Sequence, residues 1–292
     1  MTIDPAADPA ADASAEFIAT DLHGHTLFSD GRTSPEEYVD LRARKKLQVI
    51  ALSDHDTFAG VHRAARKARE LGITLVPAME TTSTIHFGTT LAEQIHILAY
   101  FPPAFVDDGR LEKTFLHERS LRLAEKWKSY VMGFVARQSA HTRQVLGEAE
   151  LADTDPADFP GLQTMINRIV ERHQPTYFDF QLDHVHFWDD EELFGWSPEE
   201  LIAQIRRDGG FDVVAHPVRV RDKARMDEVL HAAWGLEAYT SRHRQDIAEG
   251  FRRRAEAMGK HWTASSDDHQ HGPYMRPQAG TPRATVERIL RT

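Results

Sequence analysis

The sequence of 292 residues predicts an α/β fold in which strands and helices alternate to form a parallel sheet or barrel. Three observations support this fold class. Short, continuously apolar runs end in His and Asp, helix-start signals follow several of these runs, and the alternation stops for one long helical stretch before it resumes. Polar residues therefore collect where strands finish, which predicts an active face at the carboxyl ends of the strands.

Composition limits the classes of function. The formal net charge of −10 argues against nonspecific binding to nucleic-acid polymers, which depends on basic side chains. The chain has 17 His and no Cys, so any metal site must use imidazole and carboxylate ligands, which suit Mn, Fe, Zn or Mg. No apolar run approaches the roughly 20 residues of a membrane span. Residues 1–16 lack the features of a signal peptide, and we expect a disordered tail and a cytoplasmic protein.

The first predicted strand, 17–19, leads directly into His23, His25 and Asp30. Histidines at positions i and i+2 project from the same side of an extended backbone, so the pair can bind one ion. An isolated pair of this kind is more often incidental than a metal site, and it needs support from other segments. A helix of about residues 34–47 follows, because Ser, Pro and Glu at its start form a capping box.

Two further predicted strands also end in residues that can bind a metal ion. The buried run 49–52 ends in Asp54, His55 and Asp56, and after a helix of about 57–71 the run 73–80 ends in Glu80. The apolar run 94–101 then contains a histidine at position 96. For these last two residues there are plainer alternatives, namely a loop carboxylate for Glu80 and, for His96, a core histidine bonded to a backbone carbonyl.

The stretch 102–196 predicts an inserted helical subdomain that caps the active face. We expect helices at about 110–146 and 162–173, and the basic residues of the first are more typical of a solvated helix face than of a substrate site. These residues are Arg119, Arg122, Lys126 and Lys128. A second pair, His184 and His186, lies in an irregular segment, which favours surface or lid residues over metal ligands.

Regular alternation resumes at residue 197 with the same capping signature as at residue 34. A helix to about 208 and the strand 211–215 lead to His216 and, three residues later, Arg219. After a helix near 223–233, the strand 236–239 exits into Arg242 and His243. A helix of about 245–258 and the run 261–264 lead to Asp267 and His269, and a last helix is expected near 285–290.

The strand ends together supply nine side chains that suit one metal centre. They are His23, His25, Asp30, His55, Glu80, His96, His216, Asp267 and His269. A single ion rarely takes more than about six protein ligands, so this number predicts two or three ions that share a ligand. Glu80 is the natural bridge, because a carboxylate has two oxygens to offer.

The motifs DLHGHTLFSDG, SDHD, AHP and SSDDH occur in this order, with Glu80 and His96 between them, and resemble those of the PHP (polymerase and histidinol phosphatase) domain family. The resemblance covers about residues 17–101 and 200–275. It implies a distorted (β/α)7, TIM-like barrel with two or three divalent ions at the strand ends. We therefore expect barrel segments 17–101 and 197–292 with the helical insertion 102–196 between them.

By motif position the resemblance also implies how the ligands are shared. The first ion would take His23, His25, Glu80 and Asp267, the second Glu80, His96 and His216, and the third Asp30, His55 and His269. Asp30 stands where the histidinol phosphatase branch usually has histidine, and Ser266 where a glycine is more common. Asp30 changes one ligand of the predicted third ion, whereas Ser266 changes the local backbone and no ligand.

The chemistry expected of such a centre is hydrolysis of a phosphate ester. Divalent ions lower the pKa of bound water from about 15.7 toward roughly 7, so a bridging hydroxide could attack phosphorus without a protein nucleophile. Asp56 would support a ligand or move a proton, with the supporting role favoured, and Asp54 likewise. Arg219, His243 and Arg122 are the predicted phosphate-binding residues, and His243 could also protonate the leaving group.

We therefore expect a metal-dependent phosphoesterase that acts on a small phosphorylated metabolite, namely a nucleotide, a nucleoside bisphosphate or a sugar phosphate. Three alternatives remain open. The same centre would serve a cyclic phosphodiesterase, a similar barrel and ligand set would serve an amidohydrolase, and some PHP modules are noncatalytic parts of larger assemblies. No nucleic-acid polymer or membrane is expected as a partner.

Overall fold

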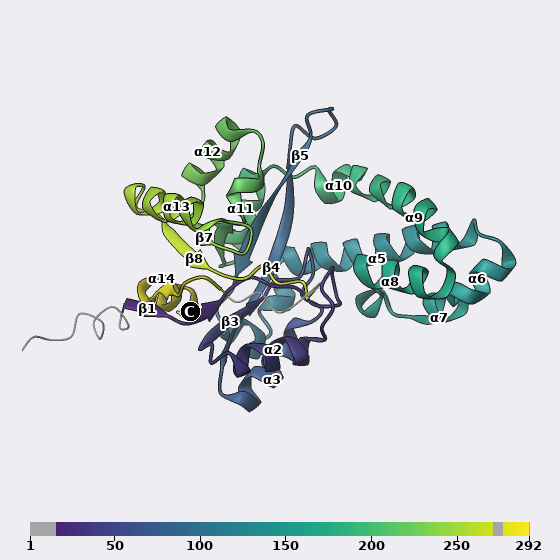
Figure 1. The fold of residues 1–292 in the computed structure, drawn as a ribbon, viewed down its shortest axis with the longest axis horizontal. Coiled ribbons are helices and arrows are strands. Elements are labelled where there is room, and N and C mark those ends of the chain that lie inside the picture. The colour runs from purple at the N-terminus through teal and green to yellow at the C-terminus, as the bar shows by residue number, and fades with distance from the viewer. Residues whose placement is uncertain (1–15, 271–276, 292) are drawn as a thin grey trace, which may run out of the picture.

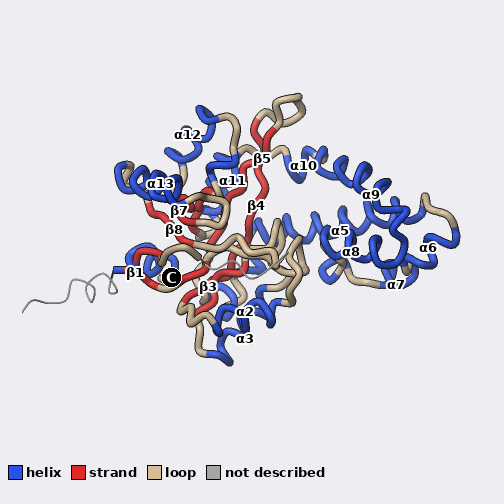
Figure 2. The backbone as a smooth tube through the Cα atoms, viewed as in Figure 1, coloured by secondary structure: helices blue, strands red, loops and turns tan. Residues whose placement is uncertain are grey.

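The computed structural model describes residues 16–270 and 277–291, and the expected tail of residues 1–16 lies almost wholly outside them. Its centre is a seven-stranded sheet that curls into a nearly closed barrel (Figures 1 and 2). The strands lie in chain order and are β2 (Thr20–Asp21), β3 (Val49–Leu52), β4 (Thr74–Ile85), β5 (Glu93–Tyr100), β6 (Phe211–Val214), β7 (Gly235–Tyr239) and β8 (His261–Ala264).

Closure of the barrel joins the first and last strands at their carboxyl ends. Gly24 and Asp268 form a parallel bridge, and the amide of His25 donates to the carbonyl of Asp268 at 3.0 Å. The amide of Asp267 donates in turn to the carbonyl of His23 at 3.0 Å. Segments 244 residues apart in the chain are thereby brought side by side, and both carry predicted ligands.

One strand corrects the expectation of a parallel sheet. β2, β3 and β4 are parallel, as are β6, β7 and β8, but β5 is antiparallel to both of its neighbours. The physical reason is the short connection 86–92 between β4 and β5, because a parallel crossover needs about a dozen residues or more. Reversal of β5 places His96 opposite Thr82, close to the predicted bridge Glu80.

Helices surround the barrel much as the alternation predicts. They are α2 (Pro35–Arg44), α3 (Val61–Leu71), α11 (Pro198–Arg207), α12 (Lys223–Ala232), α13 (Gln245–Ala257) and α14 (Arg283–Leu290). Both predicted capping boxes form, at Ser34 with Glu37 and at Ser197 with Glu200. The helix expected from residue 57 begins only at Val61, because residues 57–60 form a turn.

The beginning and the end of the described chain meet at the amino-terminal side of the barrel. The strand predicted at 17–19 is β1 (Phe17–Ile18), which directly precedes β2 and pairs with β9 (Thr281–Pro282) in a separate two-stranded sheet. α14 packs Val286 and Ile289 against Ile18 in a buried cluster that also includes residues of β3 and β6. No described helix is long and apolar enough to cross a membrane.

The stretch between β5 and α11 is helical and extends from one side of the barrel (Figure 1). Its elements are α4 (Ala104–Asp107), η1 (Leu111–Lys113), α5 (Phe115–Ala136), α6 (Ala140–Leu146), α7 (Glu148–Asp153), η2 (Pro156–Asp158), α8 (Leu162–His173), η3 (Gln174–Thr176), α9 (Tyr177–Asp183), η4 (His184–Asp189) and α10 (Glu191–Phe194). The helix expected at 110–146 is broken, because Ser139 caps a new helix.

The insertion has a hydrophobic cluster of its own. Buried residues from Trp127 to Phe194 pack together in it, separately from the barrel clusters. By contrast, Phe105 and Leu111 at the start of the stretch are buried in the main barrel core. The separately packed part of the insertion therefore begins within α5, and the domain boundary at residue 102 stays a prediction.

Candidate metal centre

Glu80, a fully buried residue of β4, is the hub of the predicted centre. Its two carboxylate oxygens face opposite groups of imidazoles. Oε2 lies 3.0 Å from His23 Nε2, 3.2 Å from His25 Nε2 and 3.3 Å from His55 Nδ1, while Oε1 lies 2.8 Å from His96 Nδ1 and 2.9 Å from His216 Nε2. A carboxylate so placed can bridge ions on its two sides.

The donor atoms form three groups, each compact enough to hold an ion. They are His23, His25, Glu80 and Asp267; His55, Glu80 and His96; and His25, Asp30, His55 and His269. His216 joins through Glu80, so the structure brings all nine predicted side chains together. It differs from the motif-based sharing in that His25 and His55 each belong to two groups.

Charges in this cluster are arranged to suit cations. Burial by itself would lower the pKa of His23 and His25, but nearby carboxylates raise the pKa of His23 well above its usual value and that of His25 to about 10. Burial would conversely raise the pKa of Glu80 and Asp267, and the surrounding imidazoles hold both well below their usual range. Ionised carboxylates among imidazole nitrogens are a donor set that fits divalent ions.

Three residues at strand exits have left-handed backbone conformations, which non-glycine residues rarely adopt. Their φ angles are 51° for Asp56 after β3, 29° for His216 after β6 and 51° for Asp267 after β8. Such strain persists only where the surroundings enforce it, and it is common at functional sites. The chain thus accepts local strain to direct side chains into the barrel mouth.

A second layer of carboxylates holds the ligands, and Glu237 in β7 is the member that the sequence did not reveal. Its Oε1 lies 3.0 Å from Nδ1 of His23, and its Oε2 accepts from the amide of His216 at 2.7 Å. Ser265 donates a further hydrogen bond to it. Glu237 is fully buried, so it fixes the orientation of His23 from the side opposite Glu80. Its only sequence signal was a carboxylate inside an apolar strand.

Asp54 and Ser266 support the loops that carry ligands. Asp54 accepts from the amide and hydroxyl of Thr26 at 2.7 and 2.6 Å and from the hydroxyl of Ser29 at 2.6 Å, between His25 and Asp30. Ser266 donates its amide and its hydroxyl to the two oxygens of Asp21, each at 2.8 Å. The serine at this position therefore adds a hydrogen bond that a glycine could not make.

Asp56 is bound to the insertion. Its carboxylate accepts from the amide and hydroxyl of Thr82 at 2.9 and 2.5 Å and from Nη1 of Arg119 at 2.5 Å. Burial would raise the pKa of Asp56, but Arg119 and Thr82 lower it below its usual value. Nη2 of Arg119 also donates to the carbonyls of Thr82 and Leu193, so the expectation of a solvated Arg119 was wrong. This arrangement favours support over proton transfer for Asp56.

The three predicted phosphate-binding residues have different surroundings. Arg219 is exposed and lies three residues after His216, to whose carbonyl its amide donates at 3.1 Å. Arg122 lies 3.8 Å from Glu192 on the surface of the insertion. His243 is 2% exposed and donates from Nδ1 to the carbonyl of Ala238 at 2.8 Å.

Burial lowers the pKa of His243, and its ring stacks on Phe251. A neutral side chain enclosed in this way is poorly suited to protonate a leaving group. Arg242 is better placed for phosphate, because its Nε donates to Oδ2 of Asp267 at 2.5 Å while 40% of its side chain is exposed.

The second histidine pair lies outside the three metal-capable groups of the described residues. His184 is buried in the insertion, where its Nδ1 lies 2.9 Å from the carbonyl of Phe180. His186 is exposed and pairs with Asp189 at 3.4 Å. Sequence spacing alone cannot separate this pair from His23 and His25, whereas the position of the pair in the fold does.

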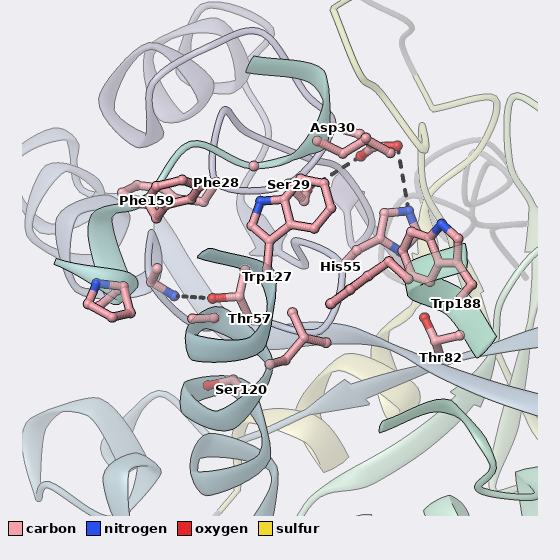
Figure 3. Close-up of a pocket in the computed structure, with 18 of the residues that line it drawn as sticks. Phe28, Ser29, Asp30, His55, Thr57, Thr82, Ser120, Trp127, Phe159 and Trp188 are labelled. Carbon is pink, nitrogen blue, oxygen red and sulfur yellow. Dashed lines mark hydrogen bonds and ion pairs between the residues drawn. The ribbon is translucent and has the colours of Figure 1, made fainter. Parts of the chain in front are cut away.

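A cavity opens from the metal cluster toward the insertion. Asp30, His55 and His96 line both the cluster and this cavity, and the aromatic side chains of Trp127 and Phe159 line its far side (Figure 3). A substrate bound at the metal-capable groups would therefore extend toward the helices.

Comparisons with known proteins agree with this geometry. A family model described as "PHP domain" matches residues 21–233. The chain is 24% identical over 272 residues to a 3',5'-nucleoside bisphosphate phosphatase from Chromobacterium violaceum, which covers 86% of this chain and 87% of that protein. It is 43% identical to a 5'-3' exoribonuclease from Haemophilus influenzae, but over 63 residues only, 22% of this chain and 23% of that one.

Among solved structures, a protein from Bifidobacterium adolescentis described as a metal-dependent phosphoesterase superimposes with a TM-score of 0.67. The match covers 94% of this chain and 96% of that one at 24% sequence identity, which establishes a shared fold. The fold and the family model thus agree on the same kind of barrel.

Proposed function

Because this chain belongs to the PHP domain family and is a metal-dependent phosphoesterase, we propose that it hydrolyses a small phosphorylated metabolite: a nucleotide, a nucleoside bisphosphate or a sugar phosphate. The observation that carries the proposal is the position of Glu80, whose two oxygens face five imidazoles. The nucleoside bisphosphate phosphatase that matches most of the chain supports a substrate of this size.

The site would hold two or three divalent ions, of Mn, Fe, Zn or Mg. The three donor groups share Glu80, His25 and His55, and such sharing is typical of ions that lie close together. When bound, the ions neutralise phosphate oxygens and make a deprotonated water available near neutral pH. No protein nucleophile is required.

The chain's own residues have three tasks in this reaction. Glu237 and Asp54 hold the ligands and their loops in position, which keeps the donor atoms aligned before substrate arrives. Arg242 presents its guanidinium group beside Asp267, and Arg219 follows the ligand His216 by three residues, so both could contact the oxygens of a phosphate. Glu237 and Asp54 are buried, so bulk water is excluded from their hydrogen bonds and these are strengthened.

A substrate panel tests the proposal. The full-length protein, purified with Mn²⁺, is offered phosphomonoesters, cyclic phosphodiesters, a 5'-phosphorylated oligonucleotide and N-acyl compounds, and product release is measured. We expect inorganic phosphate from phosphomonoesters. Hydrolysis of an amide with no turnover of any phosphate ester would overturn the proposal, and preferential cleavage of the oligonucleotide would contradict a small-metabolite substrate.

A further inference from the structure

Arg42 is a charged residue that the fold buries completely, although it belongs to α2, a helix on the outside of the barrel (Figure 1). Its guanidinium carbon lies 3.2 Å from the centre of the Tyr38 ring, and its Nη1 donates to the carbonyl of Tyr38 at 3.3 Å. The hydroxyl of Tyr38 donates in turn to the carbonyl of Ala51 in β3 at 2.5 Å. The guanidinium group is therefore held in one place against the barrel wall.

The partners of this guanidinium group are carboxylates on the two segments that close the barrel. Nη2 of Arg42 lies 2.9 Å from Oδ2 of Asp21, at the end of β2, and 3.8 Å from Oδ2 of Asp268, beyond β8. Both carboxylates are buried. We call the junction of residues 21–25 with residues 265–268 the seam of the barrel. Arg42 thus contacts both sides of the seam from outside.

Asp21 connects Arg42 to a predicted ligand across the seam. Its two oxygens accept the amide and the hydroxyl of Ser266, each at 2.8 Å. Ser266 directly precedes Asp267, whose own amide donates to the carbonyl of His23 at 3.0 Å. A shift of Asp21 would therefore move the backbone on which Asp267 and His23 depend.

Gly24 shows how closely Arg42 approaches the first histidine pair. A methyl group on Gly24 would lie 2.6 Å from Nη2 of Arg42 and 2.7 Å from the hydroxyl oxygen of Tyr38. The residue between His23 and His25 consequently has room for no side chain. The guanidinium group lies directly behind the turn that presents both imidazoles to the centre.

We propose that Arg42 is a positioning residue for the metal centre, which fixes the spacing between the segment of His23 and His25 and the segment of Asp267. The inference rests on the proposed metal centre but not on the identity of the substrate. Buried charges that are paired resist separation, because each would be left without a partner in a medium of low dielectric constant. Donor atoms held in this way need little ordering when an ion binds, so Arg42 should raise the affinity for the ion.

A second pair of this kind in the barrel provides a matched control. Arg206 of α11 donates from Nε and Nη2 to the two oxygens of Asp212 in β6, at 2.7 and 3.1 Å, and Asp212 is fully buried. Asp212 lies near the amino end of β6, whereas the predicted ligand His216 follows the carboxyl end. Both pairs join an outer helix to a strand, but Asp212 lies away from the barrel mouth.

The first test measures the dissociation constant of Mn²⁺ by isothermal titration of the metal-free full-length protein. Arg42→Gln should weaken binding about 10- to 100-fold, as is typical for residues behind the ligands, whereas Arg206→Gln should stay within about twofold of the wild type. Circular dichroism without metal shows that each variant is folded. Wild-type affinity in folded Arg42→Gln would overturn the proposal, while a wild type that binds no Mn²⁺ would refute the metal centre instead.

Arg42→Lys keeps the test decisive if Arg42→Gln does not fold. Lysine retains the charge, but one ammonium group cannot reproduce the contacts of the planar guanidinium with Tyr38, Asp21 and Asp268. We expect Mn²⁺ binding to weaken about tenfold, the low end of the range for such residues. Wild-type affinity in this variant would show that the position of Arg42 is unimportant for the centre.

A double-mutant cycle separates positioning from a role in stability alone. Ser266→Gly removes the hydroxyl that donates to Asp21 and leaves the backbone amide. If Arg42 acts through Asp21, Ser266→Gly should weaken Mn²⁺ binding less in the Arg42→Gln or Arg42→Lys protein than in the wild type, by about twofold or more. The same factor in both backgrounds would overturn the proposed connection across the seam.

Discussion

The mouth of the barrel and the helical insertion both line one cavity, but the side chains buried in the two regions differ in kind. At the barrel mouth, buried carboxylates contact imidazoles: Glu80 lies among several histidines, and Glu237 contacts His23 from the other side. In the insertion, buried rings pack on rings, as Trp127 does on Phe187. The first arrangement positions ions and phosphate, while the second offers shape and apolar surface. The difference fits our proposal that the reaction takes place at the barrel mouth.

The largest effect should come from the barrel side of this comparison. Glu80→Gln removes the charge of a carboxylate that faces both sides of the cluster, so kcat/KM should fall by more than the roughly 10- to 100-fold typical for residues behind the ligands. Bound metal, measured by mass spectrometry, should fall with it. Glu287→Gln on α14 is the matched control, and equal activity in the two variants would show that Glu80 is not the bridge.

Glu237→Gln should have the next largest effect. The amide oxygen can still accept from the backbone amide of His216, but an NH2 group then replaces the oxygen that faces His23 and Ser265, so no negative charge lies against His23. We expect affinity for Mn²⁺ or activity to fall about 10- to 100-fold while the unfolding midpoint in urea changes little. Loss of stability with unchanged metal affinity would make Glu237 a structural residue only.

The ion pair between Arg119 of the insertion and Asp56 of the barrel should affect stability. Arg119→Ala leaves Asp56 buried and unpaired, which should lower the free energy of unfolding by about 3–5 kcal/mol. Arg122→Ala, three positions later on α5, removes an exposed contact with Glu192 and should cost only about 0–1 kcal/mol. Urea denaturation measures the free energy of unfolding of both variants. Equal effects would contradict the claim that Arg119 holds the insertion to the barrel through Asp56.

The smallest effect is expected on the outer surface of the insertion. His186 is exposed and pairs only at 3.4 Å with Asp189, so His186→Ala should change the free energy of unfolding by less than about 0.5 kcal/mol. Activity and bound metal should equal those of the wild type. A loss of metal in this variant would show that the second histidine pair takes part in the centre.

The sequence predicted the barrel side of the molecule well, because its ligands follow short apolar strands and carry their own signal. The position of His55 or Asp267 after a strand was enough to place it at the mouth. The reversed direction of β5 was not predicted, since an apolar run has the same pattern in either direction. Glu237 was missed because its role depends on His23, 214 residues away.

The insertion was less predictable for a related reason. Arg119 has the sequence setting of a solvated residue, and only tertiary contacts with Asp56 and Leu193 bury it. The aromatic cavity draws Phe28 and Trp188 from segments far apart in the chain, and no local period connects them. Patterns along a chain show which face of an element is apolar, but not which distant element covers it.

Metal content measured against turnover tests the central claim most directly. Protein freed of metal with a chelator is titrated with Mn²⁺, and bound ions per chain and release of phosphate from a monoester are measured at each step. The account predicts no hydrolysis without metal and full activity only when two or three ions are bound. Full activity of the metal-free protein, or of protein that holds a single ion, would contradict it.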